Sequence, residues 1–184
     1  MSGVTLADDF SLCLPINAGD NVLWIHSIPV SKDVYKRFFL ILAKAFSVMH
    51  AESVNSIVGP RIATYLLEDV AEKAGQLETV RNGFIAEIRR ITTVCALTDQ
   101  GWQQFPIDIA EKRKMIDEEV SQEAISAAIF FTLNWHGMPK NYREPMIAAT
   151  AGMHEWQVLR SSLMEFLNSL PTSMQAAPIT EMPH

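Results

Sequence analysis

The feature that most limits how this chain can fold is that its strand-like segments occur only as two short pairs. Residues 10–16 and 22–28 flank a five-residue cluster rich in Asn and Gly, and residues 93–97 and 102–105 flank a four-residue turn that ends in Gly. Such pairs are typical of antiparallel β-hairpins. Helix-like segments fill most of the remaining chain. We therefore expect an α+β fold, mostly helical, with an N-terminal β-hairpin and a second short hairpin.

Length and composition indicate a single domain. The chain has 184 residues, of which 48% are apolar and 20% charged, so one well-packed core is expected. We assign residues 1–170 to one α-rich domain. Residues 171–184 contain few large apolar side chains, and we expect them to form a flexible C-terminal tail.

Two prolines restrict where the first hairpin can lie in a sheet. Pro15 and Pro29 supply no backbone donor. Each is therefore expected at a strand end or on an exposed edge.

The segment 31–50 predicts a helix that is apolar almost all round. Ser31 precedes it and can cap its first free amides. One interpretation is a central helix, buried on several sides, against which the first hairpin packs. The other is a surface for self-association or for a client protein. The inward stripe comprises Val34, Phe38, Ile41, Leu42 and Ala45.

Phe39 and Phe46 lie outside that inward stripe. They are seven positions apart, which places them on the same face of a helix, about two turns along its axis. If the domain buries only the inward stripe, these two rings must be covered by something else. We therefore identify Phe39 and Phe46 as candidate partner-binding residues.

Further helices follow from apolar periodicity and from start and stop signals. Asn141 with Glu144, and Ser162 with Glu165, have the spacing of capping interactions. The expected helices cover residues 60–73, 79–92, 108–114, 121–137 and 146–151 and a short segment after Ser162.

Charge and hydropathy argue against two classes of partner. The net charge is -6, whereas nucleic-acid binding relies on clustered basic residues, so no nucleic-acid partner is expected. The longest segment without a charged residue, 124–139, has sixteen residues. A membrane-spanning helix needs roughly 20. We expect no membrane partner either.

The sequence shows no signature of a catalytic or metal site. The five histidines lack the spacing of a helical zinc site, and Cys13 and Cys95 are eighty-two positions apart. Both cysteines lie in apolar strand-like segments, where buried, inert thiols are expected. No Gly-flanked nucleophile and no phosphate-cradling loop occurs. We predict a protein that is not an enzyme, with no catalytic residue, no metal and no cofactor, in a reducing cytoplasm.

Three charged segments remain. Residues 117–119 are three acids that we expect to be solvated. Arg89 and Arg90 are expected at the surface, with the alternative that they fix a partner's register against acidic residues. At residues 59–61, Gly-Pro-Arg begins a helix, and an anion site there is the alternative to a plain helix start.

Six short blocks of the sequence, taken in order, resemble a known family. They are Leu14-Pro15-Ile16, residues 24–31 (WIHSIPVS), 34–39 (VYKRFF), 59–63 (GPRIA), 87–90 (EIRR) and 161–173 (SSLMEFLNSLPTS). Together they are similar to the tail assembly chaperones of tailed bacteriophages, and the resemblance covers nearly the whole chain. Two features differ from the family pattern, namely Met164 and the segment 134–140.

The resemblance implies a non-enzymatic helper of virion assembly in the host cytoplasm. Such a chaperone binds the tape measure protein, recruits tail tube subunits to it during tail assembly, and is absent from the finished virion. Self-association into a homo-oligomer stays open beside this, because the apolar helix over 31–50 is also a candidate surface for a second copy. One alternative is a structural minor tail or connector protein of the virion. Another is a small enzyme whose site is assembled from distant residues.

Overall fold

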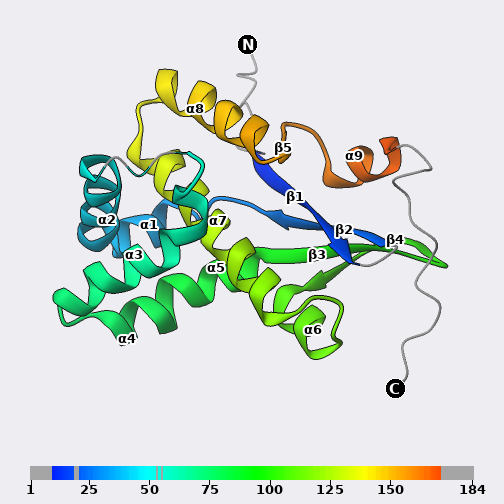
Figure 1. The fold of residues 1–184 in the computed structure, drawn as a ribbon, viewed down its shortest axis with the longest axis horizontal. Coiled ribbons are helices and arrows are strands. Elements are labelled where there is room, and N and C mark those ends of the chain that lie inside the picture. The colour runs from blue at the N-terminus through cyan, green and yellow to red at the C-terminus, as the bar shows by residue number, and fades with distance from the viewer. Residues whose placement is uncertain (1–9, 19–20, 53, 55, 171–184) are drawn as a thin grey trace, which may run out of the picture.

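Five strands form one antiparallel sheet in the computed structural model, which describes residues 10–18, 21–52, 54 and 56–170. The strand order is β4-β3-β2-β1-β5 (Figure 1). Both predicted hairpins are present, and β2 joins them by pairing with β3. The α+β fold with a helical majority is therefore confirmed. The strands are β1 (Ser11–Ala18), β2 (Asn21–Ser27), β3 (Thr92–Thr98), β4 (Gly101–Pro106) and β5 (Gln157–Leu159).

The first hairpin has a tighter connection than predicted. Ala18 pairs with Asn21, so the ladder continues through residues that the sequence assigned to a five-residue loop. Only Gly19 and Asp20 remain between the strands, and they lie outside the described residues. The five-residue connection was wrong because Asn17 and Asn21, although common in turns, are paired in the ladder.

Strand β5 was not predicted, because three residues are too few to show a period. It pairs only with Ser11–Cys13 of β1. Pro15, opposite Trp24, therefore lies where one side of β1 has no strand partner among the described residues. Pro29 follows the end of β2. Both positions agree with the expected placement of the two prolines.

The predicted helix 31–50 is interrupted at Phe38. Helix α1 (Lys32–Arg37) begins at Ser31, whose Oγ accepts a hydrogen bond from the Val34 amide at 3.3 Å, as expected. Helix α2 (Phe39–Ala51) follows directly. The buried ring of Phe38 packs against Gly83, where an added Cβ would lie 2.4 Å from Cζ of Phe38.

The next helices follow the predicted order with one irregularity. Helix α3 (Gly59–Lys73) has Pro60 in its first turn and ends before Gly75, which has a φ of 68°. The segment predicted as one helix over 79–92 consists of α4 (Leu77–Val80), the π-helical turn η1 (Arg81–Ile85) and α5 (Ala86–Ile91). Gly83 lies in η1, and its missing side chain makes room for Phe38.

Helix α7 (Glu118–Gly137) occupies the centre of the molecule. It packs against α2, α3, α5, α6, α8 and β1, and most of its residues are buried. Asp117 caps it by accepting a hydrogen bond from the Val120 amide at 2.8 Å. The interpretation of segment 31–50 as the central helix that supports the hairpin is therefore wrong. That position belongs to α7, which follows α6 (Ile107–Lys112).

The C-terminal helices flank β5. Helix α8 (Lys140–Met153) is longer than the predicted 146–151 segment, and Asn141 lies inside it rather than capping it. Glu144 instead forms an ion pair with Arg160 at 3.0 Å. Helix α9 (Leu163–Ser169) begins after Ser162 as expected, but the Ser162 side chain makes no capping hydrogen bond. The predicted flexible tail, 171–184, lies outside the described residues.

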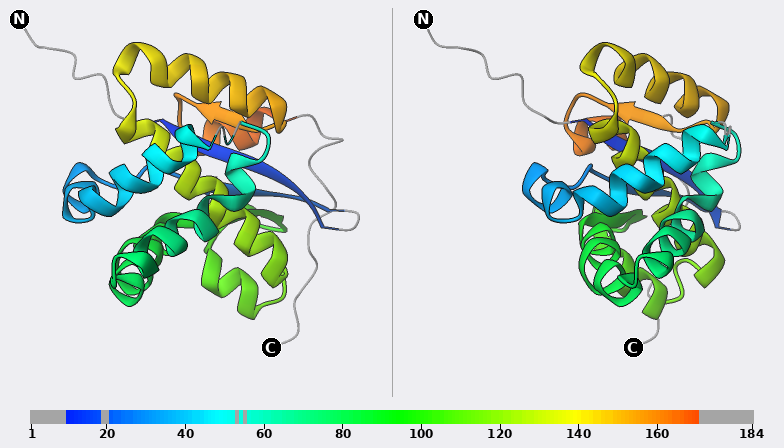
Figure 2. Two further views of the ribbon diagram at one scale, coloured as in Figure 1. Left: turned by 60° about the vertical axis from the view of Figure 1, so that its left-hand side comes forward. Right: turned by 90° about the vertical axis from the view of Figure 1, so that its left-hand side faces the viewer.

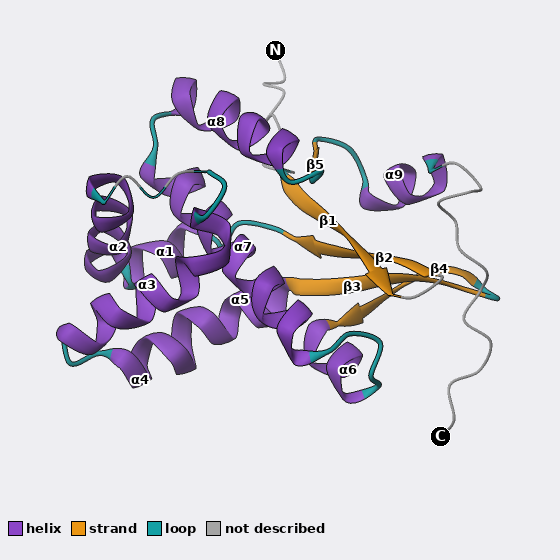
Figure 3. Ribbon diagram, in the orientation of Figure 1, coloured by secondary structure: helices purple, strands orange, loops and turns teal. Residues whose placement is uncertain are grey.

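The two faces of the sheet belong to different clusters, because successive side chains of a strand point to opposite faces. Leu12, Leu14 and Ile25 join the main core, which contains α7. Cys13, Trp24 and Cys95 face the other way and pack with α9. The Trp24 and Phe166 rings meet edge to face at 5.1 Å. Figure 3 shows α1–α4 gathered beyond one end of the strands, and Figure 2 shows α8 and β5 side by side.

Candidate functional site

The two predicted partner-binding residues lie on the same face of α2 but differ in exposure. Phe39 is 52% exposed, whereas Phe46 is half-buried. The Phe46 ring lies against Gly137, where an added Cβ would come within 2.8 Å of it, and meets the His50 ring at 4.3 Å. The absence of a side chain at Gly137 thus lets Phe46 pack on the end of α7. The inward stripe predicted for residues 31–50 is buried at Phe38, Ile41, Leu42 and Ala45, while Val34 in α1 is partly buried.

Phe46 forms one wall of an open, mainly apolar groove of about 640 Å³. We call it the α2/α8 groove. Helix α2 supplies one wall, and the end of α7 with the first half of α8 supplies the other. His50 and Tyr142 are the lining residues whose side chains carry nitrogen or oxygen atoms. The groove is lined by Phe46, His50, Gly137, Met138, Pro139, Tyr142, Pro145 and Met146.

Sequence reasoning found one wall of this groove and missed the other. Residues 138–146 were divided between a loop and a capping segment, whereas the structure places most of them on α8. Tyr142 is 65% exposed beside Phe46, and Met146 lies one turn further along α8. The signal that was available is the spacing of Met138, Tyr142 and Met146, which repeats every four residues as on one side of a helix.

Phe39 lies at the start of α2, outside the lining of the groove, and its ring belongs to a series of aromatic contacts. Its ring meets Tyr35 at 6.2 Å, and Tyr35 stacks on His136 at 4.5 Å. The His136 Nε2 is 2.8 Å from the Val30 carbonyl oxygen, so this nitrogen donates the hydrogen bond. Burial raises the pKa of Tyr35. The series connects α1 to the last turn of α7, and it fixes the start of α2 relative to the groove.

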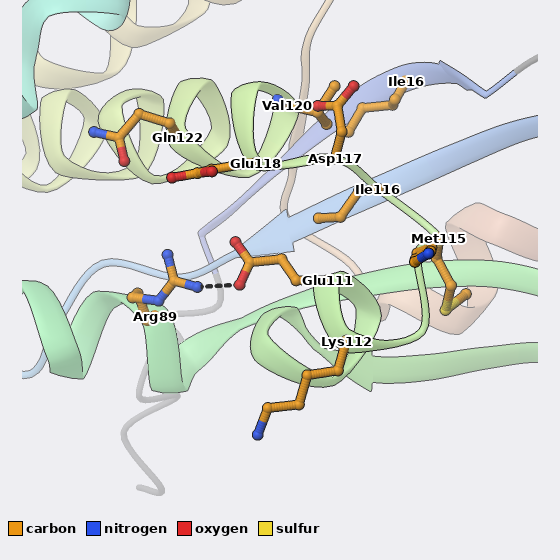
Figure 4. A pocket seen from close by; sticks show the side chains of 11 residues that line it. Ile16, Arg89, Glu111, Lys112, Met115, Ile116, Asp117, Glu118, Val120 and Gln122 are labelled. Atoms are coloured by element: carbon orange, nitrogen blue, oxygen red, sulfur yellow. Dashed lines mark hydrogen bonds and ion pairs between the residues drawn. The ribbon is translucent and has the colours of Figure 1, made fainter.

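A second pocket, of about 840 Å³, is lined mainly by charged residues of α6 and of the α6–α7 connection (Figure 4). The Arg89 and Glu111 side chains point toward one another there and form an ion pair at 2.6 Å. Arg89 also pairs with Asp108, and Arg90 pairs with Glu87 at 2.7 Å. Both arginines therefore bind acidic residues of their own chain. The alternative in which they fix a partner's register has no support from this arrangement.

The start of α3 is packed rather than open. An added Cβ at Gly59 would lie 2.4 Å from the Phe130 ring of α7, so this glycine permits close approach of the two helices. Arg61 is 3.7 Å from the Glu123 carboxylate. These contacts account for Gly59, Pro60 and Arg61 without an anion.

The other candidates for chemistry are separated or buried. His136 and His154 bind different backbone carbonyls, those of Val30 and Ser56. No cluster of three metal-ligating side chains occurs within the described part of the chain. Cys13 and Cys95 are fully buried free thiols, and burial raises the pKa of both, that of Cys95 to about 12. At neutral pH both are protonated, which agrees with the expectation of inert thiols.

Comparison with known proteins adds no relative. No protein-family model, no curated protein and no solved structure matches this chain. None of the helices in the described ranges has the length and apolar character needed to cross a bilayer.

Proposed function

We propose that this protein is a non-enzymatic tail assembly chaperone of a tailed bacteriophage. In this role it binds the tape measure protein and recruits tail tube subunits to it in the host cytoplasm. Two lines support the proposal. The first is the ordered resemblance of six sequence blocks to that family. The second is the α2/α8 groove, which contains one of the two residues predicted to bind a partner.

The observation that carries the proposal is the position of Phe39 and Phe46 on α2. The two residues are separated by about 10 Å along the helix axis, at about 1.5 Å per residue. An amphipathic client helix repeats its apolar side chains at positions i, i+3 or i+4, and i+7. A client helix laid along α2 would therefore place two of its apolar anchors opposite these two rings.

The composition of the groove suits a client helix of variable sequence. Met138 and Met146 are flexible and polarizable, so they adapt to side chains of different shapes. Pro139 precedes α8 and Pro145 lies within it, and each ring fixes the φ angle of its own residue. Fully burying a Phe side chain contributes about 1.5–3 kcal/mol, so covering the exposed half of Phe39 contributes about 1 kcal/mol.

The test is to measure binding of a tape measure protein from the same genome to purified variants. Phe39→Ser and Tyr142→Ser change exposed side chains on opposite sides of the binding surface. Each is expected to weaken binding about fivefold to tenfold, which corresponds to a loss of about 1–1.4 kcal/mol of binding free energy. Phe46→Ser is expected to weaken it further, and its thermal melt reports any loss of packing against Gly137.

Leu40→Ser is the matched control. Leu40 is next to Phe39 and is more exposed, at 79%, but it points about 100° away around the helix. Binding should be unchanged in this variant. Equal losses of binding affinity in Phe39→Ser and Leu40→Ser would contradict the proposal that the client binds along this face of α2.

Two further outcomes would replace the proposal. Detection of this chain in purified virions would favour a structural minor tail or connector protein. Loss of a homo-oligomer in Phe39→Ser, without any change in client binding, would show that this face of α2 joins two copies of the chain.

A further inference from the structure

A pocket of about 680 Å³ lies at the α7–α8 corner and shares no lining residue with the α2/α8 groove. Its walls come from the connection between β2 and α1, the last turn of α7, the first turn of α8 and the residues before α9. Four basic side chains line it, those of His26, Lys32, His136 and Arg143. We call it the basic pocket.

The charge of the basic pocket contrasts with that of the whole chain. The net charge of the protein is -6, yet no Asp or Glu is among the described residues that line this pocket. Five other arginines, at positions 61, 81, 89, 90 and 160, form ion pairs with carboxylates of the same chain. Within the described ranges, Lys32 and Arg143 form no ion pair of this kind. Their charges are therefore not neutralised inside the protein.

Arg143 is held in place but is not satisfied. Its guanidinium carbon lies 4.8 Å from the centroid of the Trp135 ring, which orients the guanidinium group by a cation–π contact. Its Nε is buried and has no hydrogen-bond partner in the described part of the protein. A buried donor without a partner is costly, so this N–H group is suited to donate a hydrogen bond to a ligand.

The rest of the pocket supplies neutral hydrogen-bonding groups. Ser161 and Ser162 contribute hydroxyls, and that of Ser162 is not used to cap α9. Burial lowers the pKa of His26, so this ring is neutral at pH 7 and adds no charge. Two cationic side chains and several hydroxyls match an anion with two negative charges and several acceptor oxygens.

We propose that the basic pocket binds a phosphate-type oxyanion, with Lys32 and Arg143 as its charged partners and Ser161 and Ser162 as hydroxyl donors. The proposal is independent of the chaperone function, because it concerns a different pocket and a different kind of ligand. It identifies the chemistry of the ligand, which both free phosphate and a phosphorylated molecule share.

Inorganic phosphate is the probe for the test. It is titrated into uniformly ¹⁵N-labelled protein at constant ionic strength, with chloride replaced by phosphate, and the tryptophan indole signals are followed by NMR. The protein has four tryptophans. The Trp135 indole signal should shift and saturate in the low millimolar range or below, because Trp135 lies under Arg143, while that of Trp102 should stay fixed.

Variants assign the charged partners. Lys32→Gln and Arg143→Gln should each weaken phosphate binding about tenfold, which corresponds to about 1.4 kcal/mol. Lys44→Gln and Arg113→Gln are the matched controls. Lys44 is an exposed lysine on α2, and Arg113 makes a similar cation–π contact, 5.3 Å from the Phe105 ring, outside the pocket. Both controls should bind phosphate like the unchanged protein.

Three results would overturn the proposal. They are a Trp135 signal that does not saturate, equal loss of affinity in the controls, and acetate binding as tightly as phosphate. If Arg143→Gln does not fold, Lys32→Gln alone decides, because Lys32 is exposed at the start of α1.

Discussion

Helices α2 and α7 are both rich in apolar residues, yet they lie in different environments. Helix α7 is buried along most of its length, whereas α2 buries one side and leaves Phe39 and Leu40 in solvent. The difference lies in side-chain size. Helix α7 carries small residues such as Ser126 and Ala128 around its circumference, so neighbouring helices can approach from several sides. The Thr64 amide of α3, for example, donates to Ser126 Oγ at 3.2 Å.

The largest change in stability is expected from shortening a core side chain of α7. Ile129 is fully buried, so Ile129→Ala should lower the free energy of unfolding by about 2–5 kcal/mol, because it removes apolar contacts and leaves a cavity. Leu40→Ala is the matched change on the exposed side of α2 and should change it by no more than about 0.5 kcal/mol. Denaturant unfolding followed by tryptophan fluorescence measures both. Similar losses of unfolding free energy at the two positions would contradict the distinction between a buried α7 and a one-sided α2.

A smaller effect is expected where α2 is fixed to the core. Gly83→Ala would force a Cβ against the buried Phe38 ring, and it should destabilise the protein by about 1–3 kcal/mol. Gly152→Ala is the control, because Gly152 is in α8 and no atom lies within 4 Å of its added Cβ. This change should stabilise the protein by about 0.5–1 kcal/mol through higher helix propensity. Thermal melts of the two variants should move in opposite directions.

The N-terminal caps of α7 and α1 are expected to differ in their contribution to stability. Asp117 caps α7 at 2.8 Å, and Ser31 caps α1 at 3.3 Å. Asp117→Ala should cost about 1 kcal/mol of unfolding free energy, and Ser31→Ala about 0.5 kcal/mol, since the Ser31 hydrogen bond is longer and its acceptor is uncharged. The urea concentrations at the unfolding midpoints of the two variants, measured at the same protein concentration, test this difference. A larger loss from Ser31→Ala would show that α1 is held more firmly than α7 at its start.

The smallest effect is expected at the turn that leads from α6 into α7. Lys114 has a φ of 56°, and the Met115 amide bonds to the Ala110 carbonyl at 2.9 Å, as in a helix end that favours glycine. Lys114→Gly should therefore raise the unfolding free energy by about 0.5 kcal/mol. Gly75 occupies the equivalent position after α3, so Gly75→Ala should lower it by a similar amount. No change in either variant would show that neither turn is strained by a side chain.

The sequence predicted the strands better than it predicted the packing of the helices. Turn residues and alternation are local signals, and they were sufficient for both hairpins. The Phe38 ring at the break packs on Gly83, which is 45 positions away, so periodicity in the segment 31–50 could not reveal this contact. In the candidate site, Phe39 and Phe46 followed from helical spacing. The second wall of the groove did not, because Asn141 and Glu144 were interpreted as a cap before a helix over 146–151, whereas α8 already begins at Lys140.

The short strand β5 has a consequence for how copies of this protein behave at high concentration. Beyond Cys13, one side of β1 has no strand partner among the described residues, and an open strand edge can template pairing with another chain. Pro15 lies in this stretch and has no amide hydrogen to donate, so it interrupts any ladder that a second molecule would build there. Pro15 thus disfavours strand pairing between copies along the part of β1 that β5 does not cover.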